Sequence, residues 1–517
     1  MLWAISGHLD RDVAVIKQVL GPSSDIVYRD FVVGKHHPVR ATLIYVDGLI
    51  DKLVLHDHLL RSIMLFGDCP GESTPTGEHL LEAIKRGCLS VAELKPATSI
   101  GEGVHGILSA ETLLLFDGVS QGLIVNTKGW EHRGISEPGT EAVIRGPKEG
   151  FGEVLRVNTA LIRRRVKDPG LRFKSLQVGK RSKTDLAIAY IDGLANQGLL
   201  DELVRRLATV NIDGVMDSGV LEQLIEDSPM SPFPQMEVTE RPDNVAAALF
   251  QGRLAIVVDG TPFVLICPSV LWSLYNSPED YYQRWLMASF VRSVRALALF
   301  ISLLMPSIYI AIISYHPEML PLRLALAVAN SRVGIPFPAA IEALLMEVSV
   351  EILREAALRL PGPIGPTIGI VGVLVVGDAA VKAQLVSAQM VVVVGITAIC
   401  SFASPSYSAA VGARLLRFPL MLLASVLGLY GVMVGVTALA VHLASLDSMG
   451  IPYMAPFAPA TQRLVGDTWI RAPLWKLKRR PVFYRPLDDK AIGEKASAWE
   501  SGESVSKTTI EKPKKGK

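Results

Sequence analysis

Hydrophobic residues are spaced very differently in the two parts of this chain. Residues 1–295 mix apolar and polar positions as globular sequences do, whereas four later runs contain no Asp, Glu, Lys or Arg. These runs are Ala296–Tyr315, Leu360–Gly377, Ala383–Ala413 and Phe418–Leu446. Because a bilayer core of roughly 30 Å needs about 20 apolar helical residues, each run is long enough to span or nearly span a membrane. Four such runs in succession predict a helical membrane domain, since a soluble protein seldom buries more than one.

In the first 295 residues, one series of strand and turn patterns occurs twice. Strand-like segments end at Asp-Gly turns in YVDGL from Tyr45 and in LLFDG from Leu114. The same signals return in YIDGL from Tyr190 and in IVVDG from Ile256, at a similar offset. The repeat predicts two related α/β subdomains, and the alternative is a chance match, because Asp-Gly turns are common after strands. The apolar segments on either side of Asp117-Gly118 also predict a β-hairpin.

A basic segment separates the two repeats. A Gly- and Pro-rich turn begins at Arg145 and leads into a predicted linker helix that ends in Arg163-Arg164-Arg165. Its positive charge fits two interpretations, contact with anionic lipid head groups or pairing with nearby acidic residues. The second is favoured, and nucleic acid is not an expected partner, because the segment lacks aromatic residues that would stack on bases.

The expected organisation follows from these boundaries. We predict an α/β head of two related subdomains, followed by an α-helical transmembrane bundle of about four spans with amphipathic helices. The predicted parts are 1–144 (first α/β subdomain), 145–183 (linker helix), 184–276 (second subdomain), 277–450 (membrane domain), 451–487 (C-terminal segment) and 488–517 (disordered tail).

Composition and charge place the head and the C-terminus on the cytosolic side. The chain has 517 residues, a mean hydropathy of +0.34, a net charge of only +2 and four widely separated cysteines without a CxxC motif. The cysteines suit a reducing compartment, and the N-terminal sequence lacks the pattern of a secretory signal. Arg284, Arg292 and Arg295 precede the first run, and further basic residues follow the last, which favours a cytosolic location for both flanks. An even number of spans, such as four, satisfies this arrangement.

No pattern of catalytic or metal-binding residues is present in the sequence. It contains no Walker phosphate loop, no GxSxG and no HExxH motif. The His36–His37 and His56–His58 pairs lack metal-ligand spacing to other ligands, so we expect them on the surface. The Gly-rich segment Gly101–Gly106 lies between weak segments and does not predict a phosphate cradle. We therefore expect no enzyme activity, no cofactor and no metal site.

Several long motifs in this chain resemble the A subunit of the GerA-type spore germination receptors. They include YVDGLID at Tyr45, RGPKEGFGEVLRVNTALIRRR from Arg145, TERPDNVA at Thr239, IPFPAAIEALLMEVSVEILREA at Ile335 and PIGPTIGIVGVLVVGDAAV at Pro363. The resemblance extends from about Ser23 to Pro481, although the family more often has Gln where Asp378 stands. It implies a nutrient receptor in the inner membrane of bacterial spores.

The same resemblance implies the partners. These are a transporter-like B subunit that binds the germinant, a lipoprotein C subunit, and further A subunits in a ring that releases monovalent cations. Membrane lipids are a further expected contact. A sporulation-stage paralogue associated with dipicolinate channel proteins is the alternative within the family, and a non-conducting scaffold that clusters germination proteins is the alternative outside it.

An acidic stripe is the first candidate for the ion path. In the amphipathic stretch Met319–Leu360, Glu347, Glu351 and Glu355 are each four residues apart and therefore share one helix face. A ring of such helices would present rings of carboxylates, which favour cations. The alternative is that Glu351 and Glu355 pair with Arg354 and Arg359 and solubilise a helix at the membrane interface.

Glycine stripes and one further carboxylate complete the candidates. Gly365, Gly369 and Gly372 share a helix face, and Asp378 lies one turn before Lys382 at the junction of two apolar runs. Asp378 is either an intramembrane carboxylate or half of an Asp–Lys pair at the interface, and the pattern favours neither. A second stripe, Gly428, Gly431 and Gly435, predicts close helix packing.

Overall fold

The computed structural model describes residues 3–33, 38–64, 81–82, 84, 94–129, 138–139, 141, 143–358, 375–459 and 467–491. The chain divides into two compact units. The head unit comprises Met1–Ile225, Val238–Pro268 and Pro473–Lys517, and the helical unit comprises Glu226–Glu237 and Ser269–Ala472. The predicted C-terminal segment 451–487 is therefore shared between the two units.

The first half of the head unit is built on a five-stranded sheet with the order β1-β2-β4-β5-β3. Its strands are β1 (Ile26–Val33), β2 (Val39–Val46), β3 (Leu94–Ala97), β4 (Thr112–Phe116) and β5 (Gly122–Val125). Strands β4 and β5 pair antiparallel around Asp117-Gly118, which confirms the predicted hairpin. The helical elements are α1 (Leu9–Leu20), η1 (Val54–Leu60), α2 (Arg61–Met64) and α4 (Ile100–Leu108).

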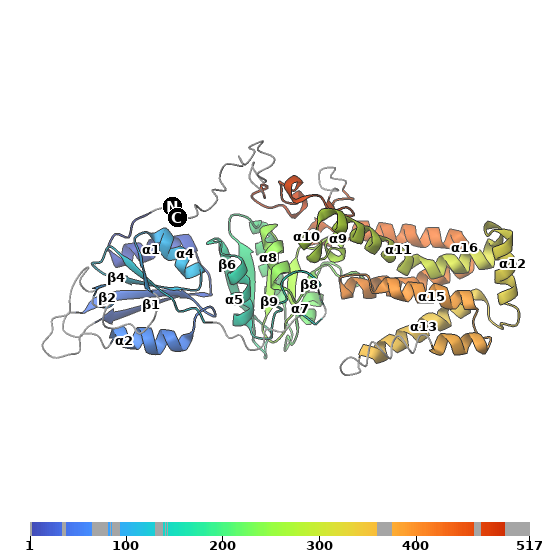
Figure 1. Cartoon of the computed structure of the whole chain (residues 1–517), viewed down its shortest axis with the longest axis horizontal. Helices are drawn as coiled ribbons and strands as arrows, with labels where there is room; N and C mark the ends of the chain where they lie inside the picture. The colour runs from blue at the N-terminus through green and yellow to red at the C-terminus, as the bar shows by residue number, and fades with distance from the viewer. Residues whose placement is uncertain are drawn as a thin grey trace, which may run out of the picture. The chain divides into compact units, whose positions relative to one another are not determined.

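Both faces of this sheet are covered, and the strand sequence shows why. Successive side chains of a strand point to opposite faces. Leu113 and Leu115 of β4 pack with α1 and α4 in one core, whereas Leu114 and Phe116 pack with η1 and α2 in another. All five residues of β4 are buried, as expected for a central strand that is apolar throughout. Figure 1 shows α1 and α4 on one side of the sheet and α2 on the other.

The second half of the head unit repeats this architecture. Its strands are β6 (Leu171–Val178), β7 (Thr184–Ile191), β8 (Glu237–Thr239), β9 (Leu254–Val258) and β10 (Val264–Cys267), in the order β6-β7-β9-β10-β8. This is the same order as in the first sheet, strand for strand, as the repeated motifs predict. Helices α5 (Leu155–Arg165) and α8 (Pro242–Phe250) pack on one face of the second sheet. Helices α6 (Gln197–Thr209) and α7 (Ser218–Ile225) complete this half.

The predicted boundary of the second subdomain at residue 184 is too late. Strand β6 pairs with β7 along its whole length, from Leu171 with Ile191 to Val178 with Thr184, but the predicted linker 145–183 contains it. The error arose from the basic residues of β6. They obscured the strand pattern of the apolar residues Leu171 and Phe173, which are both buried in the core beside α5.

The Asp-Gly turns that define the repeat have a common backbone conformation. Gly48, Gly118, Gly193 and Gly260 have φ of +89°, +80°, +76° and +85°. Only glycine adopts this left-handed region without strain, which explains why the strands end in the same dipeptide.

The Gly-rich segment near residue 101 is a helix, which the sequence analysis did not predict. Ser99 caps α4: its hydroxyl accepts a hydrogen bond from the Glu102 amide at 3.2 Å, and the Glu102 carboxylate accepts one from the Ser99 amide at 3.3 Å. A Cβ at Gly103 would lie 2.8 Å from the Leu113 side chain. The glycines therefore let α4 pack closely on the sheet.

A buried ion pair joins the two halves of the head unit. The Arg163 side chain on α5 is fully buried and donates to Asp25 from Nε at 2.9 Å and from a terminal nitrogen at 3.0 Å. Arg164 and Arg165 pair with Glu149 at the surface. The basic segment thus pairs with acidic residues, as the favoured interpretation predicted, although Arg163 is buried rather than solvated.

The helical unit contains two helices that are long and apolar enough to cross a membrane, among the residues that the structure describes. They are α11 (Trp285–Tyr315) and α16 (Tyr407–Ser445). Shorter elements are α9 (Leu271–Tyr275), α10 (Glu279–Tyr282), η2 (Pro317–Met319), α12 (Leu322–Ser331), α13 (Ala339–Leu358) and α15 (Ala388–Ser401). The strands β11 (Asp447–Ser448) and β12 (Ile451–Pro452) pair in the same unit, and η4 (Leu474–Lys476) and η5 (Val482–Tyr484) belong to the head unit.

The four predicted runs correspond to these helices only in part. The first run is the second half of α11, and most of the second run lies outside the described residues. The third run is not one helix, because it breaks at 402–406 around Pro405, and its end joins the fourth run in α16.

Helix α16 turns back on itself at Gly428. This residue has φ +61° and ψ −141°, which is not helical. A Cβ at Gly431 would lie 2.1 Å from the Leu423 carbonyl oxygen, and one at Gly435 would lie 2.4 Å from the Leu420 side chain. In a straight helix, residues 423 and 431 would be about 12 Å apart along the axis. The two halves of α16 therefore form a helical hairpin, and the predicted close packing of this glycine stripe is confirmed.

Candidate functional site

The helical unit has an apolar core with ionisable side chains inside it. Helices α11, α13, α15 and α16 contribute to one buried cluster that includes Ile310, Ala343, Met390 and Met421. The four helices are labelled in Figure 1. Several Glu and Arg side chains lie among these apolar residues, and two of the predicted site residues, Glu347 and Glu351, belong to this group.

Helix α13 turns two of its four carboxylates inward. Its buried stripe, with the spacing of one helix face, is Ala339, Glu342, Ala343, Met346, Glu347 and Val350. Glu342 is 0% exposed and Glu347 is 1% exposed. The opposite face consists of large exposed apolar residues, namely Ile341, Leu344, Leu345, Val348 and Ile352. The usual arrangement of an amphipathic helix at a water interface is therefore reversed.

Glu342 is held at the start of this stripe. Its Oε1 lies 2.8 Å from a terminal nitrogen of Arg332, which follows α12 directly. Its Oε2 accepts a hydrogen bond from the backbone amide of Ser387 at 2.9 Å. Ser387 is the N-cap of α15, so this carboxylate connects the beginnings of α13 and α15.

Glu347, the first residue of the predicted acidic stripe, forms a buried ion pair. Its Oε2 accepts from Arg417 on α16, and the Arg417 side chain is only 2% exposed. Nε of Arg417 donates to the Ser302 carbonyl of α11 at 2.8 Å. Three helices thus meet at this pair. Burying two charges is costly, and the cost is offset only when both ions are paired and hydrogen-bonded, so the loss of one partner would be more damaging than the loss of both.

Glu351 and Glu355 lie further along α13 and are less buried. Glu351 pairs with Arg354 at 3.2 Å and lies 3.9 Å from Arg414 of α16. This confirms the predicted pairing within a turn for Glu351. Arg354 also donates to the Ser401 hydroxyl at the end of α15, at 2.9 Å. Glu355 is exposed, and Arg359, its predicted partner, lies outside the described residues.

Asp378 lies apart from the ionic core, which is formed by Glu342, Glu347, Glu351 and their partners Arg332, Arg354 and Arg417. It is on a helical segment at 375–382, its side chain is 59% exposed, and Lys382 approaches it to 2.6 Å. The predicted Asp–Lys pair is thus formed. Gly365, Gly369 and Gly372 lie outside the described residues.

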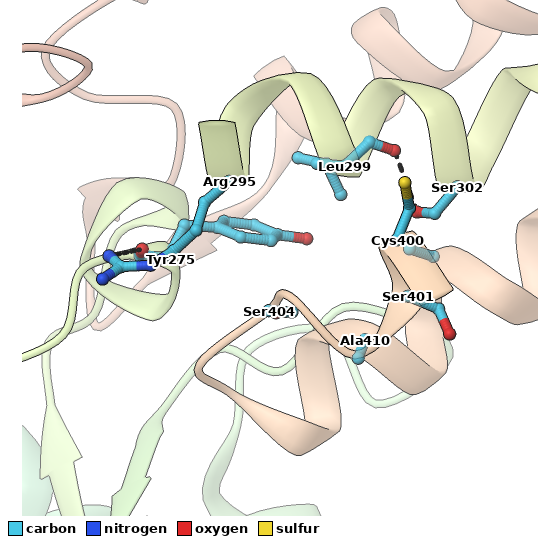
Figure 2. A pocket seen from close by; sticks show the side chains of 9 residues that line it. Tyr275, Arg295, Leu299, Ser302, Cys400, Ser401, Ser404 and Ala410 are labelled. Carbon is cyan, nitrogen blue, oxygen red and sulfur yellow. Dashed lines mark hydrogen bonds between the residues drawn. The ribbon is translucent and has the colours of Figure 1, made fainter. Parts of the chain in front are cut away.

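A small cavity lies between the ends of the helices, as Figure 2 shows. Its volume is about 10 Å³, and its lining includes Tyr275, Arg295, Ser302, Ser401 and Ser404. This is space for about one water molecule, and the hydroxyl groups supply the polar partners that a buried water needs. The cavity is too small for an organic ligand. It adjoins the ionic core, because Ser401 contacts Arg354 and the Ser302 carbonyl contacts Arg417.

A second charged cluster lies at the beginning of α11. Asp280 is buried and accepts from Arg292 at 3.0 Å and from Arg295 at 2.7 Å. Arg292 also reaches Asp467 at 3.0 Å, and the Tyr281 hydroxyl donates to the same carboxylate at 2.8 Å. Burial, followed by the nearby charge of Asp467, raises the pKa of Tyr281.

The sequence analysis assigned Arg292 and Arg295 to the cytosolic flank of a span but did not identify their acidic partners. These partners are Asp280, which lies 12 residues before Arg292, and Asp467, which lies 175 residues after it. The pattern of positive charge gave no sign that these arginines are neutralised.

Metal binding finds no support in the described parts of the chain. No group of three or more His, Cys, Asp or Glu side chains there is arranged to hold an ion. His56 and His58 are exposed, as predicted, and His36 and His37 lie outside the described residues.

These features define a class of protein: a duplicated α/β head joined to a helical unit with long apolar helices and an internal ionic core. A family model described as Bacillus/Clostridium GerA spore germination protein matches residues 14–483. The chain belongs to this family, which confirms the resemblance seen in its motifs.

Three related proteins show how far the similarity extends. Spore germination protein KA of Bacillus subtilis (strain 168) is 41% identical over 92% of this chain and 87% of its own length. A Bacillus subtilis protein named "Uncharacterized membrane protein YfkQ" is 44% identical over 93% of this chain and 92% of its own. A crystal structure of the N-terminal domain of the A subunit of the Bacillus megaterium spore germinant receptor GerK3 is 32% identical, with coverage of 52% of this chain and 98% of that one, at a TM-score of 0.41.

Proposed function

We propose that this chain is the A subunit of a nutrient germinant receptor in bacterial spores and that it assembles into a ring that forms a ligand-gated cation channel. The receptor role is supported by the names of its relatives, several of which are spore germination proteins. The observation that carries the ion-conducting role is the presence of ionisable side chains, from the buried Glu347 to the exposed Asp378, in an otherwise apolar helical unit. Ionisable residues at membrane depth are costly, and they commonly mark ion or proton pathways.

The candidate path residues differ in their access to water. The side chain of Glu347 is 1% exposed, that of Glu351 is 30% exposed and that of Asp378 is 59% exposed. A carboxylate attracts cations from a hydrated path only if its oxygens reach that path. We therefore place Asp378, together with the face of Gly365, Gly369 and Gly372, ahead of the Glu347, Glu351 and Glu355 stripe. Glu347 would join the path only in a conformation in which Arg417 has released it.

Ion flux through the assembled receptor tests this proposal. The complete receptor, with its transporter-like B and lipoprotein C subunits, would be reconstituted in liposomes, and potassium and chloride release would be measured upon addition of germinant. Asp378→Asn should reduce cation selectivity, and Lys382→Gln, which removes the opposite charge of the same pair, should not. Flux that is the same with and without this chain would leave only the scaffold function.

A sporulation-stage role is the second candidate, because one relative at 44% identity is named only as a membrane protein. Deletion of the gene separates the two roles. Loss of nutrient-triggered germination in otherwise normal spores supports the receptor. Normal germination with a defect in spore maturation supports the paralogue.

The proposed location is the spore inner membrane, with several spans and with the head and C-terminus in the cytosol. Single cysteines at Met216, which is 75% exposed in the head unit, and at Lys507 would be treated with a membrane-impermeant maleimide in inverted and right-side-out vesicles. Both should react only from the cytosolic side. Reaction of only one of them from that side would require an odd number of spans.

A further inference from the structure

We propose that α13 lies within the membrane and that the face formed by Ile341, Leu344, Leu345, Val348 and Ile352 contacts lipid acyl chains. Glu342 and Glu347 then lie on the face of α13 that the other helices cover. The inference rests on the membrane location in the proposed function but not on ion conduction.

The first argument is the direction of the charges. A helix at an interface turns its carboxylates to water and its apolar residues to protein or lipid. In α13 the carboxylates of Glu342 and Glu347 are buried and bound to Arg332 and Arg417, whereas the outward face is apolar. Exposure of this face to water would be unfavourable, and soluble proteins seldom expose contiguous apolar patches of this kind. Charges that face inward and pair with one another are typical of a helix surrounded by hydrocarbon.

The second argument is that the outward face has no unmet polar group. Besides Glu342, Glu347 and Glu351, the only polar residue between Ile341 and Ile352 is Ser349. Its hydroxyl donates to the Leu345 carbonyl of the same helix at 2.8 Å. The apolar face extends for about 16 Å along the axis, and Glu355 marks its end. This face therefore covers about half of a bilayer core of roughly 30 Å.

The third argument favours lipid over a second copy of the chain. Contacts between membrane helices are enriched in small residues, which let backbones approach closely. The outward face of α13 instead carries large aliphatic side chains. The same type of surface occurs on α11, which is long enough to span, and on the first half of the α16 hairpin: Leu297 is 61% exposed, Leu422 is 59% exposed and Val426 is 70% exposed. The α13 face is thus of the same kind as the outward faces of the helices beside which it packs.

The accessibility of spin labels tests the proposal. Single cysteines would be placed at Leu345 and Ile352 in a full-length chain lacking its native cysteines, labelled with a nitroxide and reconstituted in liposomes. Collision rates with oxygen, which concentrates in hydrocarbon, and with a water-soluble nickel chelate would then be measured. Labels at Leu297 of α11 and Met216 of the head unit provide the lipid and water references.

We expect the ratio of oxygen to nickel accessibility at Leu345 and Ile352 to match that at Leu297. A ratio that matches Met216 would place this face in water, and low accessibility to both reagents would place it in a contact between subunits. Either result would overturn the proposal. If Leu297 itself behaves like Met216, the proposed membrane location fails as well, so the two failures are distinguishable. Both substituted side chains point away from the core, so the variants should retain the fold.

Discussion

The buried pair of Glu347 and Arg417 makes the sharpest prediction about stability. Both side chains are almost fully inaccessible, and Arg417 also bridges to the Ser302 carbonyl. Glu347→Gln keeps the shape of the side chain but leaves the guanidinium of Arg417 buried without a counter-ion. Removal of one partner of a buried pair typically costs about 3 to 5 kcal/mol. For a unit of this size, that corresponds to a fall in melting temperature on the order of 6 to 20 °C.

The assay is thermal unfolding of the purified full-length chain in detergent, followed by loss of the monodisperse peak in size-exclusion chromatography. Arg417→Met should be similarly damaging, because it leaves the Glu347 carboxylate buried. The double variant Glu347→Gln/Arg417→Met should lose clearly less than the sum of the two single losses, since no unpaired charge remains. Glu355→Gln, which neutralises an exposed carboxylate on the same helix, is the matched control and should change the melting temperature far less, because exposed charge pairs contribute little to stability.

Two results would refute this reasoning. Additive losses in the double variant would show that the two side chains do not interact. A Glu347→Gln variant that keeps its stability but loses cation selectivity would assign Glu347 to a water-filled path and not to the helix core.

Three further predictions concern other parts of the chain. Gly428→Ala should destabilise the helical unit by about 2 to 4 kcal/mol, because φ +61° with ψ −141° is strained for any other residue and the new Cβ would lie 3.1 Å from Tyr315. Gly395→Ala in α15, where a Cβ meets nothing within 4 Å, is the control and should be tolerated. Equal losses of stability in the two variants, measured by thermal unfolding, would contradict the hairpin. Asp25→Asn should cost about 3 kcal/mol in the unfolding free energy of the head unit because it leaves Arg163 buried and unpaired, whereas Asp10→Asn in the exposed Asp10–Arg40 pair should have no measurable effect in the same denaturant titration. Burial, and then the charge of Asp227, raises the pKa of Glu226 from its ordinary value of 4.5 to about 7. Since the folded state binds this proton more tightly than the unfolded state, stability should fall as pH rises from 4.5 to 7, and Glu226→Gln should flatten that part of the melting-temperature curve; an identical slope in the variant would show that another group titrates.

The head could be predicted largely from its sequence because its signals are local. An Asp-Gly turn, an alternating strand and a capping residue each act over a few residues, and the two repeats, YVDGL and YIDGL, gave the same evidence twice. The exceptions have local causes too. Charged side chains obscured the strand pattern of β6. Gly103 and Gly106 weakened the helix pattern of α4, since glycine lowers helix propensity, although close packing on the sheet stabilises α4 here.

The site was less predictable because its partners are distant in sequence. Glu351 and Arg354 are three residues apart, and that pair was anticipated. Arg417 is 70 residues from Glu347, so only the packing of α13 against α16 shows which way the acidic stripe points. A sequence pattern gives the faces of a helix but not which face is covered. In a soluble protein the apolar face is the covered one, and in a membrane that rule can be reversed.

This reversal changes what an acidic stripe means for ion conduction. If the inward carboxylates of α13 are neutralised by Arg332, Arg354 and Arg417, they provide no free negative charge to a passing cation in this conformation. The Glu347–Arg417 pair and the hydrogen bond from the Ser387 amide to Glu342 then fix the register of α13 against α16 and α15, because each forms at only one alignment of the helices. A path for cations would have to lie elsewhere, on a surface where a carboxylate such as Asp378 is accessible, or would open only when these pairs separate. In the second case, the free energy needed to break a buried pair becomes part of the barrier to opening. Weakening the Glu347–Arg417 pair would then increase ion leakage in the absence of germinant, an effect that a purely structural pair would not produce.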